Sequence, residues 1–219
     1  MKDKVNIIIP SITISKELIT CLKGIKSLNY KNFIVSIIID YDNKIKLPRF
    51  NFKIKKIIVG KIFMSKKRNI AAKKFKTDYI AFVDSDCYPC KNWLKKAIKY
   101  LKSMPIHVVG GPNIPFKNQS YSEKITSFCK RSFFISGHLN YRKYKSPQKF
   151  CKDYLESCNL IMKRSVFLKC KGMNENVYIG EDKELFENLK IKIRNFKALF
   201  TPDVFVYHKQ RKILKFLLQ

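Results

Sequence analysis

Short runs of apolar residues alternate along this chain with segments in which apolar residues recur every three or four positions. Runs such as "VNIIIP" (5–10) and "YIAFVD" (79–84) carry few polar residues, which indicates strands covered on both faces. Such strands alternating with helices are typical of an α/β fold with a mostly parallel central sheet flanked by helices. The pattern predicts strands at 5–10, 33–40, 53–59, 79–84, 106–111, 154–164 and 202–210, and helices at 15–28, 65–76, 91–103 and 181–191, with Ser15 and Ser65 opening the first two.

The stretch at 112–152 departs from this alternation, because it is polar, aromatic and only weakly periodic. We expect it to be a variable insert within the domain. The chain has no internal repeat and no clear linker, so a single domain is predicted for residues 1–211. The tail at 212–219 is basic and amphipathic, and we expect it to lead into a membrane-associated part that this chain lacks.

The chain has 46 Lys and Arg against 16 Asp and Glu, a formal net charge of +30. Such a charge favours anionic partners, which include phosphorylated substrates, acidic lipid and nucleic acid. An AT-rich coding sequence also enriches Lys, so the charge alone does not choose among these partners. No apolar stretch is long enough for a membrane-spanning helix, and the N-terminus lacks the pattern of a signal peptide.

The seven cysteines are odd in number and irregularly spaced, which favours reduced thiols in the cytoplasm. Cys87 and Cys90 form a C-x-x-C pair after the strand predicted at 79–84. A zinc site would need a second pair of ligands at a usable spacing, and none is found among Cys129, Cys151, Cys158 and Cys170. We therefore expect Cys87 and Cys90 to be loop residues with neither a redox nor a metal-binding role.

Two predicted strands end in pairs of acids one residue apart. Asp40 and Asp42 follow one of them, and Asp84 and Asp86 follow another. Ligands of open α/β sheets bind at the carboxyl ends of the strands, and paired carboxylates suit Mg²⁺ or Mn²⁺ carrying phosphate oxygens. Asp also ends strands for local reasons of turn geometry, so the pairs alone leave both interpretations open.

The order of the segments "VNIIIPS", "FIVSIIID", "KKRNIAAKKFKTDYIAFVDSDCYPCKNWL", "ESCNLIMKRSVF" and "YIGEDKEL" resembles the inverting family 2 glycosyltransferases of the GT-A fold. The resemblance extends from about residue 5 to about residue 211, and its most specific parts are the R-N-x-A…D-S-D-x-x-P block and the later G-E-D. It implies a Rossmann-like GT-A domain in which 112–152 lies on the acceptor side. The implied activity is metal-dependent transfer of a sugar from a nucleotide diphosphate sugar to a hydroxyl acceptor, in surface polysaccharide or glycolipid assembly.

The resemblance also implies roles for individual residues. Asp40 would bind the nucleobase, Lys67 and Arg68 would neutralise the pyrophosphate, and a helix N-terminus would add favourable charge there. The family often has an aromatic residue and an Asn after the first Pro, whereas this chain has "PSIT" (10–13), so the identity of the base stays open. The implied donor-binding residues are Pro10, Ser11, Asp40, Lys67, Arg68, Asp84 and Ser85, and the implied ligands of Mn²⁺ or Mg²⁺ are Asp86 and His208.

The G-E-D motif would supply the catalytic carboxylates. Inverting transfer needs a base that deprotonates the acceptor hydroxyl, and within the family pattern Asp182 takes this role while Glu181 orients the acceptor. Acids in the first turn of a helix also serve as ordinary favourable charges, and a lone His such as His208 at a strand end is often structural. A base would have a raised pKa, which the sequence does not reveal.

Two further partners follow from the charge. Basic and aromatic residues interleave in "KRSFF" and "YRKYK", which suits a nucleic-acid-binding α/β protein without transferase activity, as the alternative function. No recognised nucleic-acid-binding motif is present, so we expect no nucleic acid partner. The basic insert and tail instead suit an anionic membrane surface, and we expect a cytoplasmic protein at the inner face of the cell membrane with a lipid-linked glycan as acceptor.

Overall fold

The structure is a computed structural model that describes residues 3–143, 146–210 and 212–213. The strands of its larger sheet are β1 (Val5–Pro10), β2 (Phe33–Ile39), β3 (Ile54–Ile58), β4 (Tyr79–Val83), β6 (Val108–Gly110), β8 (Lys149–Cys151), β9 (Asn159–Lys163) and β10 (Ala198–Phe200). They lie in the order β3-β2-β1-β4-β9-β6-β10-β8. All run in one direction except β9 and β8, so the described sheet is mostly parallel, as predicted.

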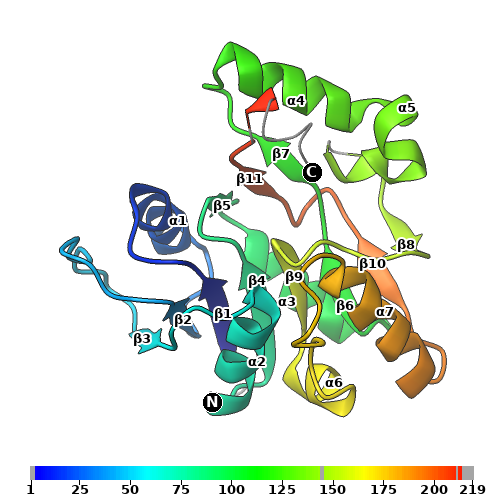
Figure 1. The fold of residues 1–219 in the computed structure, drawn as a ribbon. Coiled ribbons are helices and arrows are strands. Elements are labelled where there is room, and N and C mark those ends of the chain that lie inside the picture. The colour runs from blue at the N-terminus through cyan, green and yellow to red at the C-terminus, as the bar shows by residue number, and fades with distance from the viewer. Residues whose placement is uncertain (1–2, 144–145, 211, 214–219) are drawn as a thin grey trace.

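Helices cover both faces of this sheet (Figure 1). On one face lie α1 (Lys16–Lys26) and α3 (Trp93–Ser103), and on the other lie α2 (Met64–Lys74), α6 (Arg164–Lys169) and α7 (Glu181–Lys192). In β1, Ile7 and Ile9 pack toward the first face and Ile8 toward the second, and all three are fully buried. Because successive strand residues point to opposite faces, burial of both faces requires the continuous apolar runs in the sequence. The predicted α/β fold is confirmed.

A second, three-stranded sheet joins distant parts of the chain. It consists of β5 (Cys87–Pro89), β11 (Val206–His208) and β7 (Asn113–Pro115). Cys87 pairs directly with His208 in the antiparallel β5–β11 ladder. The last described strand is thereby held next to Asp86, at the end of β4.

The segment at 112–152 is more regular than its weak periodicity predicted. It contains α4 (Tyr121–Arg131), the short α5 (Phe133–Ser136) and the 3₁₀-helical η1 (Gly137–Lys143), which lie at the top of Figure 1. Ser120 and Glu123 form a capping box at the start of α4. Reciprocal capping satisfies two backbone donors, and within α4 the apolar residues Tyr121, Ile125, Phe128 and Cys129 recur at helical spacing, although the segment as a whole is weakly periodic.

Other differences concern the ends of elements. The helix expected from Ser65 begins one residue earlier, with Phe63 as its N-cap and Ser65 buried inside the first turn, whereas Ser15 caps α1 as predicted by accepting a hydrogen bond from the Leu18 amide. The strands expected at 154–164 and 202–210 shorten to β9 and β11, and β5, β10 and α6 were not anticipated. Of the basic tail at 212–219, only residues 212 and 213 lie within the described part. None of the helices described is long and apolar enough to cross a membrane.

Candidate active site

An open cleft lies at the carboxyl ends of the parallel strands. In strand order, β1 lies between β2 and β4, so the chain leaves β1 toward one side and later returns on the other. Ligand crevices of open α/β sheets form at such switch points. The cleft has a volume of about 1020 Å³ and is lined by Pro10, Ser11, Ile12, Thr13, Ser15, Glu17, Met64, Arg68, Asp84, Ser85, Asp86, Tyr178, Ile179, Glu181 and Lys209.

Asp40 and Lys67 lie beneath the turn that follows β1 rather than in the cleft lining. The Lys67 side chain is fully buried, and its Nζ lies 2.7 Å from Asp40 Oδ1 and donates a hydrogen bond of 2.6 Å to the Ser11 carbonyl. The Asp40 amide also donates to the Ile12 carbonyl. A buried ammonium needs such partners, because an unpaired charge in the interior is costly. The expected direct contact of Lys67 with a pyrophosphate does not fit this location, since its ammonium is enclosed below the turn.

Arg68 joins the two acidic segments of the cleft. Its guanidinium lies 2.8 Å from Asp84 Oδ1 and 3.2 Å from Glu181 Oε1, so one side chain of α2 holds the end of β4 next to the start of α7. The Arg68 side chain is buried rather than solvated. A guanidinium is suited to this place because it presents several donors in a fixed plane.

Asp84 and Asp86 line the cleft, and His208 lies close to both of them. Each offers one ligand atom, and these atoms all lie within 4.8 Å of one another. His208 Nε2 is 3.3 Å from Asp86 Oδ1. Carboxylate oxygens with one imidazole are ligands that Mn²⁺ accepts, and Mg²⁺ accepts the carboxylates. The residues present therefore fit a hard divalent cation.

Asp182 lies at the beginning of α7, close to Arg68 and next to Glu181. Gly180 precedes the helix with a φ of 93°, a left-handed conformation that glycine adopts without strain, and it turns both Glu181 and Asp182 toward the sheet. Burial raises the pKa of Asp182 to about 7, a rise that Arg68 opposes and Glu181 supports. Asp182 Oδ2 accepts a hydrogen bond from the Ser157 amide, whereas Oδ1 is buried without a hydrogen-bond partner among the described residues.

Sequence comparison adds a family to this geometry. The chain matches the family model for glycosyl transferase family 2 over residues 6–168, which is more than half of its 219 residues. This chain belongs to glycosyl transferase family 2. The matched range includes Asp84 and Asp86 but ends before Asp182 and His208. The fold brings His208 to the two aspartates and Asp182 close to Arg68.

Solved structures similar to this family 2 protein share its fold at low sequence identity. S. aureus TarS 1-349 in complex with UDP-GlcNAc has a TM-score of 0.70 at 16% identity, over 95% of this chain and 59% of that one. The mannosyltransferase PcManGT from Pyrobaculum calidifontis, in complex with GDP-Man and Mn2+, has a TM-score of 0.67 at 13% identity, over 95% of this chain and 57% of that one. S. aureus TarS has a TM-score of 0.64 at 14% identity, over 90% of this chain and 36% of that one. This chain thus spans less than two thirds of each, and no curated protein sequence matches it.

Several residues of the cleft were missed by the sequence analysis of this family 2 protein. Lys209 lies in the cleft, bridges to Glu17 at 2.8 Å and follows the predicted ligand His208 directly. Tyr178 and Ile179 lie at the cleft with mostly exposed side chains, and the Tyr178 ring contacts Phe63 with the ring centroids 5.6 Å apart. The only available signal was position: these residues stand directly beside the G-E-D motif and His208 in the sequence.

Proposed function

We propose that this family 2 protein is a metal-dependent inverting glycosyltransferase. It would move a sugar from a nucleotide diphosphate sugar to a hydroxyl acceptor. The observation that carries the proposal is the group of Asp84, Asp86 and His208, which Arg68 joins to the start of α7, where Asp182 has a pKa of about 7. The complexes of TarS with UDP-GlcNAc and of PcManGT with GDP-Man and Mn2+ support the same class of donor.

The nucleotide would lie on the turn at 10–13 that follows β1. Lys67 ties Asp40 to the Ser11 carbonyl and so keeps this turn in a fixed shape, which reduces the cost of ordering it when a ligand binds. Pro10 and Ser11 would line the nucleotide. Asp40 lies beneath this turn and outside the cleft lining, so it would support the turn, and its direct contact with the base stays a prediction. Asp84 and Ser85 would bind the donor at the end of β4.

The diphosphate would lie over Asp86 and His208. A bound Mn²⁺ or Mg²⁺ would supply positive charge that neutralises the diphosphate as it becomes the leaving group. Arg68 and Lys209 line the same cleft, and we assign to them the cationic role that the sequence analysis gave to Lys67 and Arg68. The buried Arg68 would act more strongly on a phosphate than a solvated cation does, because less water screens it, whereas the Lys209 side chain is 51% exposed.

Asp182 would act as the base. Its unpartnered Oδ1 would take the proton of the acceptor hydroxyl while the hydroxyl oxygen bonds to the anomeric carbon, on the face opposite to the departing diphosphate. A pKa of about 7 suits this role, because the carboxylate is then both available and basic enough near neutral pH. Glu181 would orient the acceptor and is itself held by Arg68.

We expect donor binding to depend on the cation and on Asp86. UDP-, GDP- and dTDP-sugars would be screened by calorimetry with and without Mn²⁺, and the best donor would then be tested with Asp86→Asn. The variant is expected to weaken Mn²⁺-dependent binding by about 100-fold or more, since even the loss of partners outside the ligand shell costs 10- to 100-fold. Asp153→Asn is a matched control, because the Asp153 side chain is 40% exposed against 38% for Asp86 and lies outside the cleft.

The proposal fails if no nucleotide sugar binds in the presence of Mn²⁺, or if Asp86→Asn binds the donor as the wild type does. Salt-sensitive binding of RNA or DNA without any nucleotide-sugar binding would instead favour the alternative of a nucleic-acid-binding protein.

We also propose an acceptor and a location for the protein. We assign it to the assembly of surface polysaccharide or glycolipid at the inner face of the cell membrane, with a lipid-linked glycan as acceptor. The support is an aromatic surface on α4 and α5, formed by Tyr121, Phe128, Phe133 and Phe134, of which Phe134 is 99% exposed. Four large exposed aromatics beside Lys124 and Arg131 suit an anionic lipid surface, where each basic residue contributes about 1 kcal/mol.

We expect the protein to float with vesicles that contain acidic phospholipid and to remain unbound with neutral vesicles. Phe134→Ser should reduce the bound fraction several-fold, because it removes an apolar ring from the lipid interface. Ile191→Ser is the control, since Ile191 is 77% exposed but lies on α7, away from the aromatic surface. Equal flotation of all three proteins, or none on acidic vesicles, would contradict the assignment.

A further inference from the structure

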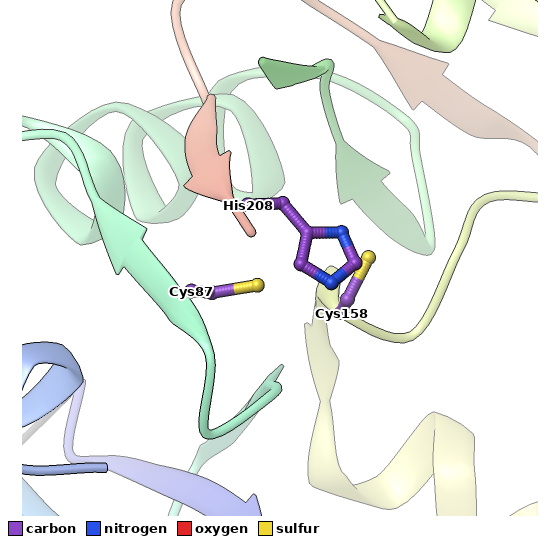
Figure 2. Close-up of side chains that lie close together, drawn as sticks. All are labelled: Cys87, Cys158 and His208. Atoms are coloured by element: carbon purple, nitrogen blue, oxygen red, sulfur yellow. The ribbon is translucent and has the colours of Figure 1, made fainter. Parts of the chain in front are cut away.

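Two cysteines and one histidine converge beside the proposed active site. Figure 2 shows the thiols of Cys87 and Cys158 and the imidazole of His208 directed toward one another from three separate segments. The two Sγ atoms and a ring nitrogen of His208 all lie within 4.8 Å of one another. Spacing along the chain did not reveal this arrangement, because Cys158 and His208 are far from Cys87 in the sequence.

The two sheets hold the members of this group in place. Cys87 and His208 are directly paired residues of the antiparallel β5–β11 ladder, and such pairs hold their side chains close on one face of a sheet. Cys158 immediately precedes Asn159, which pairs with Val83 in the central sheet. The other cysteine of the C-x-x-C pair, Cys90, lies apart from the group and donates to the Asp203 carbonyl.

We propose that Cys87, Cys158 and His208 form a second metal site, one that binds a thiophilic divalent cation such as Zn²⁺. Two thiolates and an imidazole are a usual ligand set for zinc, with the fourth position left for water or a neighbouring carboxylate. Ligands of tetrahedral zinc are about 3.6–3.8 Å apart, given metal–ligand distances of about 2.0–2.3 Å. The present separations are at most 4.8 Å, so side-chain shifts of at most about 1 Å would reach that arrangement.

The cation can reach this site from solvent. Cys87 lines a cavity of about 250 Å³ that adjoins the cleft and shares Asp86 and Lys209 with it. The His208 side chain is 23% exposed, whereas both cysteines are buried. Binding would displace the two thiol protons to solvent and leave a neutral site, because two thiolates balance one divalent cation.

His208 belongs to both sites, and this has a consequence for activity. Mn²⁺ and Mg²⁺ prefer the oxygens of Asp84 and Asp86, whereas Zn²⁺ prefers sulfur and binds a mixed site more tightly than Mn²⁺ does. Zn²⁺ held by the two cysteines would take His208 away from the carboxylates. Zinc therefore inhibits the Mn²⁺-supported transferase. This consequence rests on the proposed function, whereas the binding of the cation does not.

The binding is tested with Co²⁺, which reports its ligands by absorption, added to the reduced chain. We expect one equivalent to give a thiolate-to-metal charge-transfer band with tetrahedral visible bands, both lost when Zn²⁺ is added. Cys158→Ser should weaken binding by at least about 10- to 100-fold and diminish the charge-transfer band. Cys170→Ser is the matched control, since Cys170 is 8% exposed against 6% for Cys158 and is outside the group. No charge-transfer band in the wild type, or an unchanged band in Cys158→Ser, overturns the proposal.

A second measurement covers the case in which Cys158→Ser does not fold. Cadmium NMR of the wild-type chain is expected to give a resonance in the range of mixed sulfur and nitrogen ligands, and a shift typical of oxygen ligands alone overturns the site.

The inhibition by zinc is tested separately, on transfer activity. Substoichiometric Zn²⁺ should suppress Mn²⁺-supported transfer by the wild type at least tenfold more than transfer by Cys158→Ser. Equal inhibition of both would refute the competition for His208 while leaving the cobalt result to decide the site.

Discussion

Asp182→Asn is expected to lower the rate of sugar transfer by about 10²- to 10⁴-fold, the usual contribution of a positioned general base. The substitution keeps an oxygen that can accept the Ser157 amide hydrogen bond but removes the group that takes the acceptor proton. Steady-state kinetics with the donor and an acceptor would measure it, with kcat falling and donor affinity unchanged. Since Asp182 has a pKa of about 7, the wild-type rate should fall as the pH drops below 7, and this decline should be absent from the residual activity of the variant.

Two variants of other acids on α7 distinguish the role of Asp182 as the base from the roles of neighbouring carboxylates. Glu187→Gln changes an exposed acid of α7 that pairs with Lys190, and its activity should equal that of the wild type. Glu181→Gln should raise the KM for the acceptor more than it lowers kcat, because Glu181 is paired with Arg68 and is assigned to orientation. A larger loss of kcat in Glu181→Gln than in Asp182→Asn would transfer the role of base to Glu181.

Loss of folding does not account for the expected inactivity of Asp182→Asn. The pKa of Asp182 is about 4 in the unfolded chain and about 7 in the folded protein. Folding therefore becomes less favourable as the pH rises from about 4 to about 7, because the unfolded chain loses this proton first. Asparagine has no charge to bury, so the variant should unfold at the same or a higher temperature than the wild type above pH 7. A clearly lower unfolding temperature there would contradict the buried, destabilised carboxylate described above.

Arg68→Gln is expected to reduce the free energy of unfolding by about 3 kcal/mol, because breaking a buried ion pair leaves its partners uncompensated. Asp84 and Glu181 would then face each other across the cleft next to Asp182. The loss stays at the low end of the 3–5 kcal/mol range for buried pairs, since both carboxylates keep some contact with water. Urea denaturation followed by circular dichroism would measure it.

The control for Arg68 lies two residues away on the same helix. Lys66→Gln removes a solvated ion pair with Glu175 at 3.9 Å, which contributes at most about 1 kcal/mol. Arg68→Lys should be intermediate, because an ammonium keeps the charge but cannot bind both carboxylates in a fixed plane. Equal stability of Arg68→Gln and Lys66→Gln would mean that Arg68 does not hold the two acidic segments together.

Local sequence patterns were sufficient to predict the central strands of the larger sheet. Uninterrupted apolar runs predict β1 and β4, because a strand that is buried on both faces needs an apolar residue at nearly every position of the sequence. The positions of Asp84 and Asp86 at a strand end follow as well, since parallel strands place their carboxyl ends at one edge. The weakly periodic segment that contains α4 was the exception, because a capping box supported a helix there.

By itself the sequence determined the α/β fold, the acids at the strand ends and the membership of family 2, because each depends on residues close together in the chain. Only the tertiary structure decided which side chains share an environment. It enclosed Lys67 beneath a turn, placed Lys209 in the cleft, raised the pKa of Asp182 through burial and brought Cys158 to Cys87 and His208. Burial and pairing between distant segments depend on how the two sheets pack, and no spacing along the chain records that.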